Sequence, residues 1–96
     1  MSYVVIHTFP GGTKEQYEAA SAAVFPTNAP PPKGLLSEVA GTSDAGWTIV
    51  ATFDSKPSWE RFRDDTLLPA LGKGISGSFT TPPSQEIAFE VSATLC

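Results

Sequence analysis

Trp47-Thr48-Ile49-Val50-Ala51-Thr52-Phe53 is the stretch that decides the fold of this 96-residue chain. It is rich in β-branched and aromatic residues, and two sets of side chains alternate along it, which predicts a strand with one set on each face of a sheet. The polar, glycine-bounded segment 41–46 comes directly before it and predicts a hairpin turn. We therefore expect an antiparallel partner strand over 34–40.

A second apolar segment, Tyr3 to Phe9, predicts the first strand of the chain. Because apolar residues occupy both alternating sets, we expect both faces of this strand to be covered. Thr13 and Gln16 form the capping-box pattern that often begins a helix. The pattern predicts a helix from this point to Phe25, ended by the proline that follows.

Another helix is expected after the 47–53 strand. Asp54 or Ser55 would cap it, and Pro57 would lie in its first turn, where the missing N–H has no cost. Pro69 predicts a kink or an interruption near Leu68. The final strand is expected over 86–92, where apolar side chains again alternate with others.

The predicted order is therefore β-α-β-β-α-β within one domain, residues 1–96. With right-handed connections this order favours an α+β, ferredoxin-like fold, in which a four-stranded antiparallel sheet carries both helices on one face. The opposite face of the sheet would then expose apolar side chains, and a patch of that kind usually marks an interface. We expect a homodimer formed through this face.

Charge and composition exclude several classes of function. Ten acidic residues against six basic ones give a net charge of −4, and no run of basic residues occurs. Binding to nucleic acid or to an anionic membrane surface is therefore not expected. No apolar stretch reaches the ~20 residues of a membrane span, and residues 1–7 lack the pattern of a signal peptide. We expect a cytoplasmic protein.

Cysteine and histidine are equally scarce. Cys96 is the one cysteine and His7 the one histidine, so neither an internal disulfide nor a zinc site of the usual Cys/His type can form. We expect no metal and no cofactor.

The chain resembles the dimeric α+β barrel superfamily, and most closely its antibiotic biosynthesis monooxygenase-like and stress-responsive members. The resemblance covers the whole element order. It is carried locally by the segment 3–10, by the segment 47–55 that enters the second helix at Ser58-Trp59, and by Pro82-Pro83 before the last strand. Phe53-Asp54-Ser55 is similar to the aromatic, acid and helix-capping Ser that end the third strand in the monooxygenases, with Phe where Trp is usual.

The resemblance implies a homodimer with a pocket for one small apolar ligand in each subunit. Members include cofactor-independent oxygenases of anthrone- or quinol-type substrates, haem-degrading enzymes, cyclases and proteins without known activity. This chain departs from the pattern in two ways. It has no Asn in the third strand, where some oxygenases carry one, and no second His to support a haem or metal site.

His7 is the candidate catalytic residue. A polar, titratable ring is unusual inside an apolar strand, which favours a functional role. Histidine can act as a general base toward a phenol or an acidic C–H. The alternative is a half-buried strand histidine that fills space and donates one hydrogen bond.

Aromatic and small side chains on two strands, together with Trp59 of the expected second helix, are candidates for a substrate-binding wall, in which Ala51 would leave room for a flat ligand. The alternative for the strand residues is ordinary core or dimer interface, and the alternative for Trp59 is the apolar face of the second helix. The candidate substrate-binding residues are Tyr3, Val5, Phe9, Trp47, Ile49, Ala51, Phe53 and Trp59.

Other polar residues are given ordinary roles. Glu38 and Glu90 are expected to face solvent from their strands, Arg63 to lie on a solvated helix face, and Tyr17 to lie at a surface edge rather than offer its hydroxyl to the cavity. Two functions remain open: an enzyme that acts on a small apolar or aromatic substrate with His7 as acid–base, or a non-catalytic ligand-binding or structural protein.

Overall fold

The computed structural model describes residues 2–26, 30–79 and 83–94. The elements in chain order are β1 (Tyr3–Phe9), α1 (Lys14–Val24), β2 (Leu35–Ser43), β3 (Gly46–Phe53), α2 (Lys56–Phe62), η1 (Arg63–Leu67), α3 (Leu68–Gly72) and β4 (Gln85–Glu90). This confirms the predicted β-α-β-β-α-β order. Pro82 and Cys96 lie outside the described residues.

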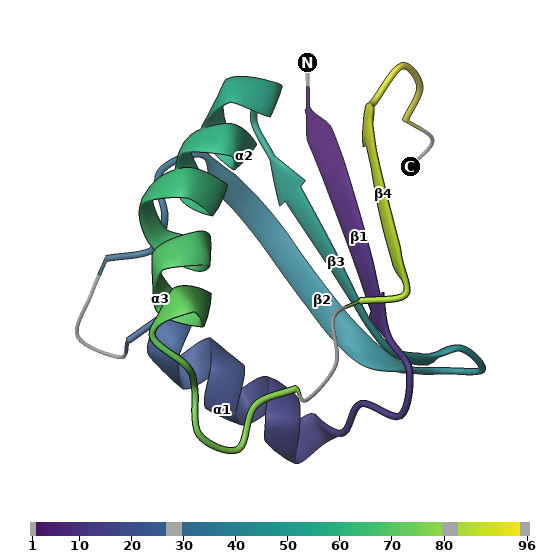
Figure 1. Ribbon diagram of the computed structural model, residues 1–96. Coiled ribbons are helices and arrows are strands. Elements are labelled where there is room, and N and C mark those ends of the chain that lie inside the picture. The colour runs from purple at the N-terminus through teal and green to yellow at the C-terminus, as the bar shows by residue number, and fades with distance from the viewer. Residues whose placement is uncertain (1, 27–29, 80–82, 95–96) are drawn as a thin grey trace.

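The four strands form one antiparallel sheet in the order β2-β3-β1-β4. The helices of the described residues cover one face of it, which we call the inner face, and none of them lies on the other, the outer face (Figure 1). The register pairs Val5 with Ala51 and His7 with both Ile49 and Glu86, so these side chains share the inner face. The predicted ferredoxin-like α+β fold is confirmed.

Both helix starts follow the chemistry expected from the sequence. The Thr13 hydroxyl accepts a hydrogen bond from the Gln16 N–H, and the Gln16 side chain accepts one from the Thr13 N–H, which completes the capping box. Ser55, rather than Asp54, caps α2 by accepting a hydrogen bond from the Ser58 N–H.

The second helical region passes Pro69 without a break. A proline cannot donate to the carbonyl four residues earlier, and its ring crowds that carbonyl. The chain responds with the π-helical turn η1, in which the Leu68 N–H donates to the Arg63 carbonyl, five residues back. The predicted disturbance is therefore found next to Leu68, as a widening of the helix followed by α3.

Strand β2 is longer than predicted, and a bulge interrupts its alternation. The strand continues to Ser43, so the turn that follows it contains only residues 44 and 45. Strand β4 is shorter than predicted and ends at Glu90 rather than at 92. A β-bulge lies between Leu35 and Ser37. An extra residue in a strand exchanges the faces of all the residues after it.

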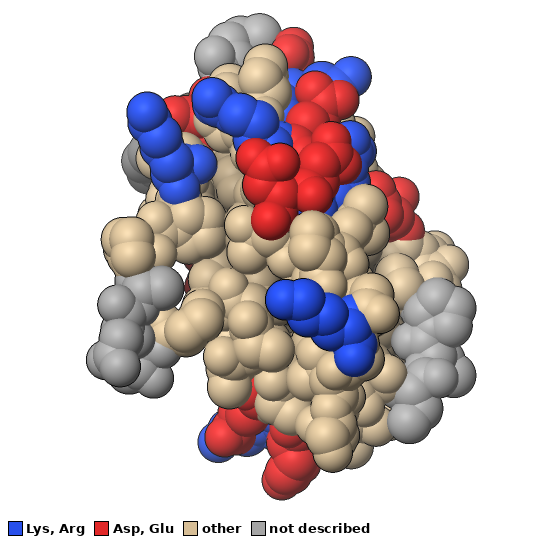
Figure 2. All heavy atoms as spheres, turned by 60° about the vertical axis from the view of Figure 1, so that its left-hand side comes forward, with Lys and Arg blue, Asp and Glu red and all other residues tan. Residues whose placement is uncertain are grey.

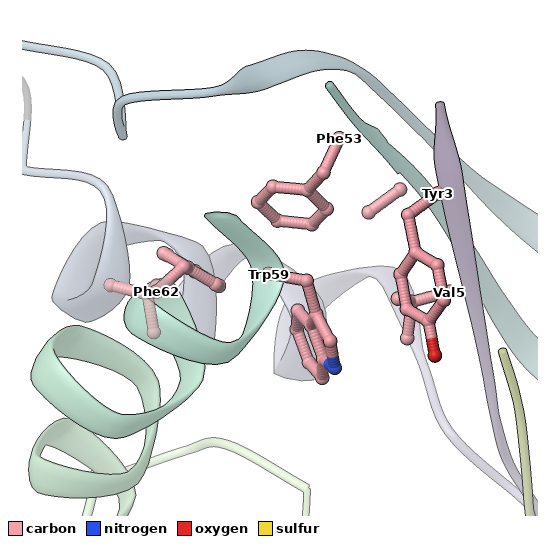
Figure 3. Close-up of a cluster of buried hydrophobic side chains, with 7 residues drawn as sticks. Tyr3, Val5, Phe53, Trp59 and Phe62 are labelled. Atoms are coloured by element: carbon pink, nitrogen blue, oxygen red, sulfur yellow. The ribbon is translucent and has the colours of Figure 1, made fainter. Parts of the chain in front are cut away.

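The core lies between the inner face and the helices. Trp59 and Phe62 of α2 pack against Phe53 of β3, with ring centroids 5.5 and 5.7 Å from that of Phe53. In Figure 3, Phe53 and Trp59 lie between Phe62 on the helix side and Tyr3 and Val5 on β1. The cluster of buried residues is Tyr3, Val5, Val24, Ala51, Phe53, Trp59 and Phe62.

The outer face is less well covered. Val4 and Ile6 of β1 are half-buried, so the expectation that both faces of the first strand are covered is not met within one chain. Val39 of β2 is 65% exposed, and Ile87 and Phe89 of β4 are each 47% exposed. These residues make the outer face an apolar patch of the kind that marks an interface.

The helical side of the molecule carries charges of both signs. Figure 2 shows Asp and Glu side chains next to Lys and Arg side chains on this side. Wide uncharged areas lie between these mixed groups. No helix among the described residues is long and apolar enough to cross a membrane.

Candidate functional site

A cavity of about 510 Å³ lies between the inner face and the helices. Its floor is formed by Val5, Ile49 and Ala51, and Trp59 and Phe62 of α2 contribute to its walls. The size is within the range of small-molecule sites, and a mostly apolar lining with a few polar groups is also typical of them. The cavity is therefore the candidate functional site.

His7 lines this cavity from the centre of the sheet. Its Nε2 lies 3.2 Å from Oε2 of Glu86, its neighbour on β4. The imidazole side chain is 18% exposed, and its ring centroid is 6.0 Å from that of Trp59. If Nε2–H donates to the Glu86 carboxylate, the neutral ring keeps Nδ1 as a free acceptor, which is the arrangement a general base needs.

Glu86 itself was not a candidate from the sequence. It begins the predicted last strand, and the alternation of Glu86, Ala88 and Glu90 places these three on one face. Which residue of another strand faces Glu86 depends on the pairing of β1 with β4, and these two strands lie more than 70 residues apart in the chain.

A second polar pair lines another part of the cavity. The Tyr17 hydroxyl of α1 donates a hydrogen bond to the Glu38 carboxylate of β2, and both residues are half-buried. Burial, followed by the hydrogen bond and the negative charge of Glu38, raises the pKa of Tyr17 above its ordinary value. The Tyr17 ring also packs against Trp47, with centroids 5.4 Å apart.

This pair corrects two sequence expectations. Glu38 was expected to face solvent, but the bulge in β2 shifts the alternation, so Glu38 pairs with Ala51 and faces inward. Tyr17 was expected at a surface edge, but it lines the cavity. The bulge has no signature in the sequence of β2, so the alternation alone leads to the wrong face.

Arg63 in η1 also lines the cavity, although a solvated helix face was expected for it. Its Nε donates to Oδ1 of Asp64 at 2.9 Å, and this hydrogen bond raises the pKa of Arg63. Arg63 is therefore a half-exposed cation at the cavity, already engaged by a neighbouring carboxylate.

The predicted substrate-binding residues divide into two groups. The cavity lining includes Val5, Phe9, Ile49, Ala51 and Trp59. The other three are not among the lining residues: Tyr3 and Phe53 belong to the buried cluster, and Trp47 packs on Tyr17, which itself lines the cavity.

Phe79 is a lining residue that sequence reasoning missed. It comes from the loop between α3 and β4 and stacks on Phe9, with ring centroids 4.0 Å apart and planes 7° apart. Gly12 makes room for this contact, since a Cβ there would lie 2.9 Å from the Phe79 ring. A loop of Gly, Ser, Thr and Pro gives no periodicity from which such packing could be predicted.

No group of three or more His, Cys, Asp and Glu side chains that could hold a metal ion occurs among the described residues. The arrangement instead offers a base candidate, a carboxylate–phenol pair and an apolar floor. Chemically it can bind a flat apolar ring system and exchange a proton with it.

Comparison of the sequence with known protein families and with curated proteins finds no match. Comparison of the structure with solved structures does find matches. A candidate antibiotic biosynthesis monooxygenase from Chloroflexus aurantiacus is similar with a TM-score of 0.62 and 17% identity, over 100% of this chain and 98% of that chain.

SnoaB, a cofactor-independent oxygenase from Streptomyces nogalater, has a TM-score of 0.62 and 14% identity, over 98% of this chain and 94% of its own. A dimeric ferredoxin-like protein of unknown function from Thermobifida fusca has a TM-score of 0.57 and 18% identity, over 93% of this chain and 88% of its own. These likenesses show that the chain has the fold of antibiotic biosynthesis monooxygenase-like, ferredoxin-like proteins, as the sequence resemblance predicted.

Proposed function

We propose that this protein is a homodimer that binds a flat, largely apolar aromatic molecule in the inner-face cavity and oxygenates it without a cofactor, with His7 as the base. The observation that carries the proposal is the position of His7. Its ring lies in a mostly apolar cavity, and a carboxylate on the neighbouring strand is within hydrogen-bond distance of one ring nitrogen.

The proposed chemistry begins with a proton transfer. His7 removes a proton from an activated CH₂ group of an anthrone-type substrate, and Glu86 stabilises the imidazolium that forms. The substrate carbanion then donates electrons to O₂ and a C–O bond forms at the same carbon. The imidazolium of His7 returns its proton to the resulting peroxide, which gives a C–OOH group. Loss of water converts this group to a carbonyl, so one oxygen atom ends in the product and the other in water.

The apolar floor has a specific part in this proposal. On the inner face Ala51 pairs with Val5 and lies two residues from Ile49, and its side chain is the smallest of the three, so a planar ring can lie flat on it. Trp59 stands beside the same space and can stack on the ring. The fold shared with a cofactor-independent oxygenase supports the same reaction class.

Dimerisation through the outer face is part of the proposal. The exposed side chains of Val39, Ile87 and Phe89 would be buried by a second copy of the same face. The T. fusca neighbour, which is described as dimeric, supports this assembly. The cytoplasmic location predicted from the sequence stays a prediction.

The test is oxygen consumption by the purified protein with an anthrone as substrate. We expect His7→Gln to lower the rate by roughly 10²–10⁴, the usual contribution of a general base, and Glu86→Gln to lower it less. Exposed Glu18→Gln is the matched control. An unchanged rate in His7→Gln would exclude His7 as the base, and saturable binding without conversion would favour the non-catalytic ligand-binding alternative.

A further inference from the structure

The Tyr17–Glu38 pair is not used by the proposed reaction, although both residues line the cavity. The pair joins α1 to the edge strand β2, and Trp47 packs against the Tyr17 ring. Tyr17 is therefore held by a hydrogen bond on one side and by an aromatic contact on the other. Because Tyr17 donates to Glu38, it fixes the position of the carboxylate.

Glu38 can accept further hydrogen bonds. An ionised carboxylate has about four acceptor sites, and among the residues that the structure describes only the Tyr17 hydroxyl donates to this one. A half-buried carboxylate beside apolar side chains is stabilised by any further hydrogen-bond donor that enters the cavity. The β2 bulge creates this situation, because it turns Glu38 inward and Val39 outward.

The sheet register fixes where Glu38 lies relative to His7. Glu38 pairs with Ala51, which pairs with Val5, and His7 is two residues further along β1. Two strand spacings and one two-residue rise separate the Cα atoms of Glu38 and His7 by roughly 12 Å. The floor between the two residues is apolar, so a three-ring aromatic molecule can lie on it with its central CH₂ group at His7 and one terminal ring directed toward Glu38.

We propose that Glu38, positioned by Tyr17, determines specificity by accepting a hydrogen bond from a hydroxyl group on a terminal ring of a polycyclic aromatic ligand whose central ring lies at His7. The inference rests on the proposed function, since it assigns the ligand class of the same cavity. It also predicts discrimination against ligands with a carboxylate at that end, because Glu38 would repel them.

The experiment compares the affinity of two three-ring probes for the intact protein. 2,6-Dihydroxyanthraquinone carries a hydroxyl group at each end, and anthraquinone carries none. We expect Glu38→Gln to weaken binding of the dihydroxy probe roughly tenfold, the usual loss for a hydrogen bond to a charged group, and to leave anthraquinone unchanged. Tyr17→Phe should weaken binding of the dihydroxy probe by a smaller factor.

Glu90→Gln is the matched control. Glu90 shares the inner face with Glu38, but it pairs with Tyr3 at the other end of β1 from Phe9. It should change neither affinity. Equal losses of affinity for both probes in Glu38→Gln would show that Glu38 has a structural role, and this would overturn the inference. An unchanged affinity for the dihydroxy probe would overturn it as well. If neither probe binds the wild-type protein, the proposed function fails together with the inference. Circular dichroism checks that each variant is folded.

Discussion

The two faces of the sheet are built from the same strands yet differ in character. The inner face combines buried aromatic side chains with inward-facing polar groups such as His7 and Glu38, and it bounds a cavity. The outer face carries Val39, Ile87 and Phe89, which are 65%, 47% and 47% exposed in the single chain. The inner face is thus covered by the chain's own helices, whereas the exposed side chains of the outer face are the reason for proposing that a second copy covers it.

The largest effect is expected at the inner face. Phe53 is 1% exposed and packs on two aromatic rings of α2, so Phe53→Ala should lower the free energy of unfolding by about 3–5 kcal/mol. Thr52→Ala, one residue away on the outer face, should lower it by less than about 1 kcal/mol. Urea denaturation measures both, and equal losses would contradict the division between the two faces.

The next effect concerns the outer face. Ile87→Lys would place a charge on each copy at the proposed interface, and it should weaken dimerisation roughly hundredfold or more while the monomer stays folded. Sedimentation equilibrium measures the dissociation constant. Asp44→Lys, in the exposed turn between β2 and β3, is the control and should leave the dimer intact. A dimer that survives Ile87→Lys would place the interface elsewhere.

The smallest effect concerns Tyr17 at the inner face. Its folded-state pKa is raised, mainly by burial, so above about pH 10 the unfolded chain releases the Tyr17 proton while the folded protein keeps it. The wild type should therefore lose stability as the pH rises beyond this value, and Tyr17→Phe should lose it less steeply.

At neutral pH the Tyr17→Phe variant should be less stable by about 1 kcal/mol, the usual value of one hydrogen bond. Denaturant titrations at several alkaline pH values give both quantities. Parallel pH profiles for the two proteins would show that Tyr17 is not shielded from solvent in the way the structure indicates.

The sequence predicted elements better than contacts. Thr13 and Gln16 gave the start of α1, and Pro69 gave the place where the helix changes its hydrogen bonding, because capping and proline effects act within a few residues. His7 was predicted as a candidate site residue because it is a single titratable ring in an apolar strand. Its partner Glu86 was missed, because only the pairing of β1 with β4 brings the two together.

Local patterns therefore determined the strands, the helix caps, the order of elements and, through them, the ferredoxin-like fold. The tertiary structure alone decided which groups meet in the cavity. Alternation along β2 would send Glu38 outward and Val39 inward, and one bulge at Leu35 to Ser37 reverses both. The physical reason is that a strand's side chains repeat every two residues, so a one-residue irregularity set by pairing with a neighbour changes the face of every residue that follows.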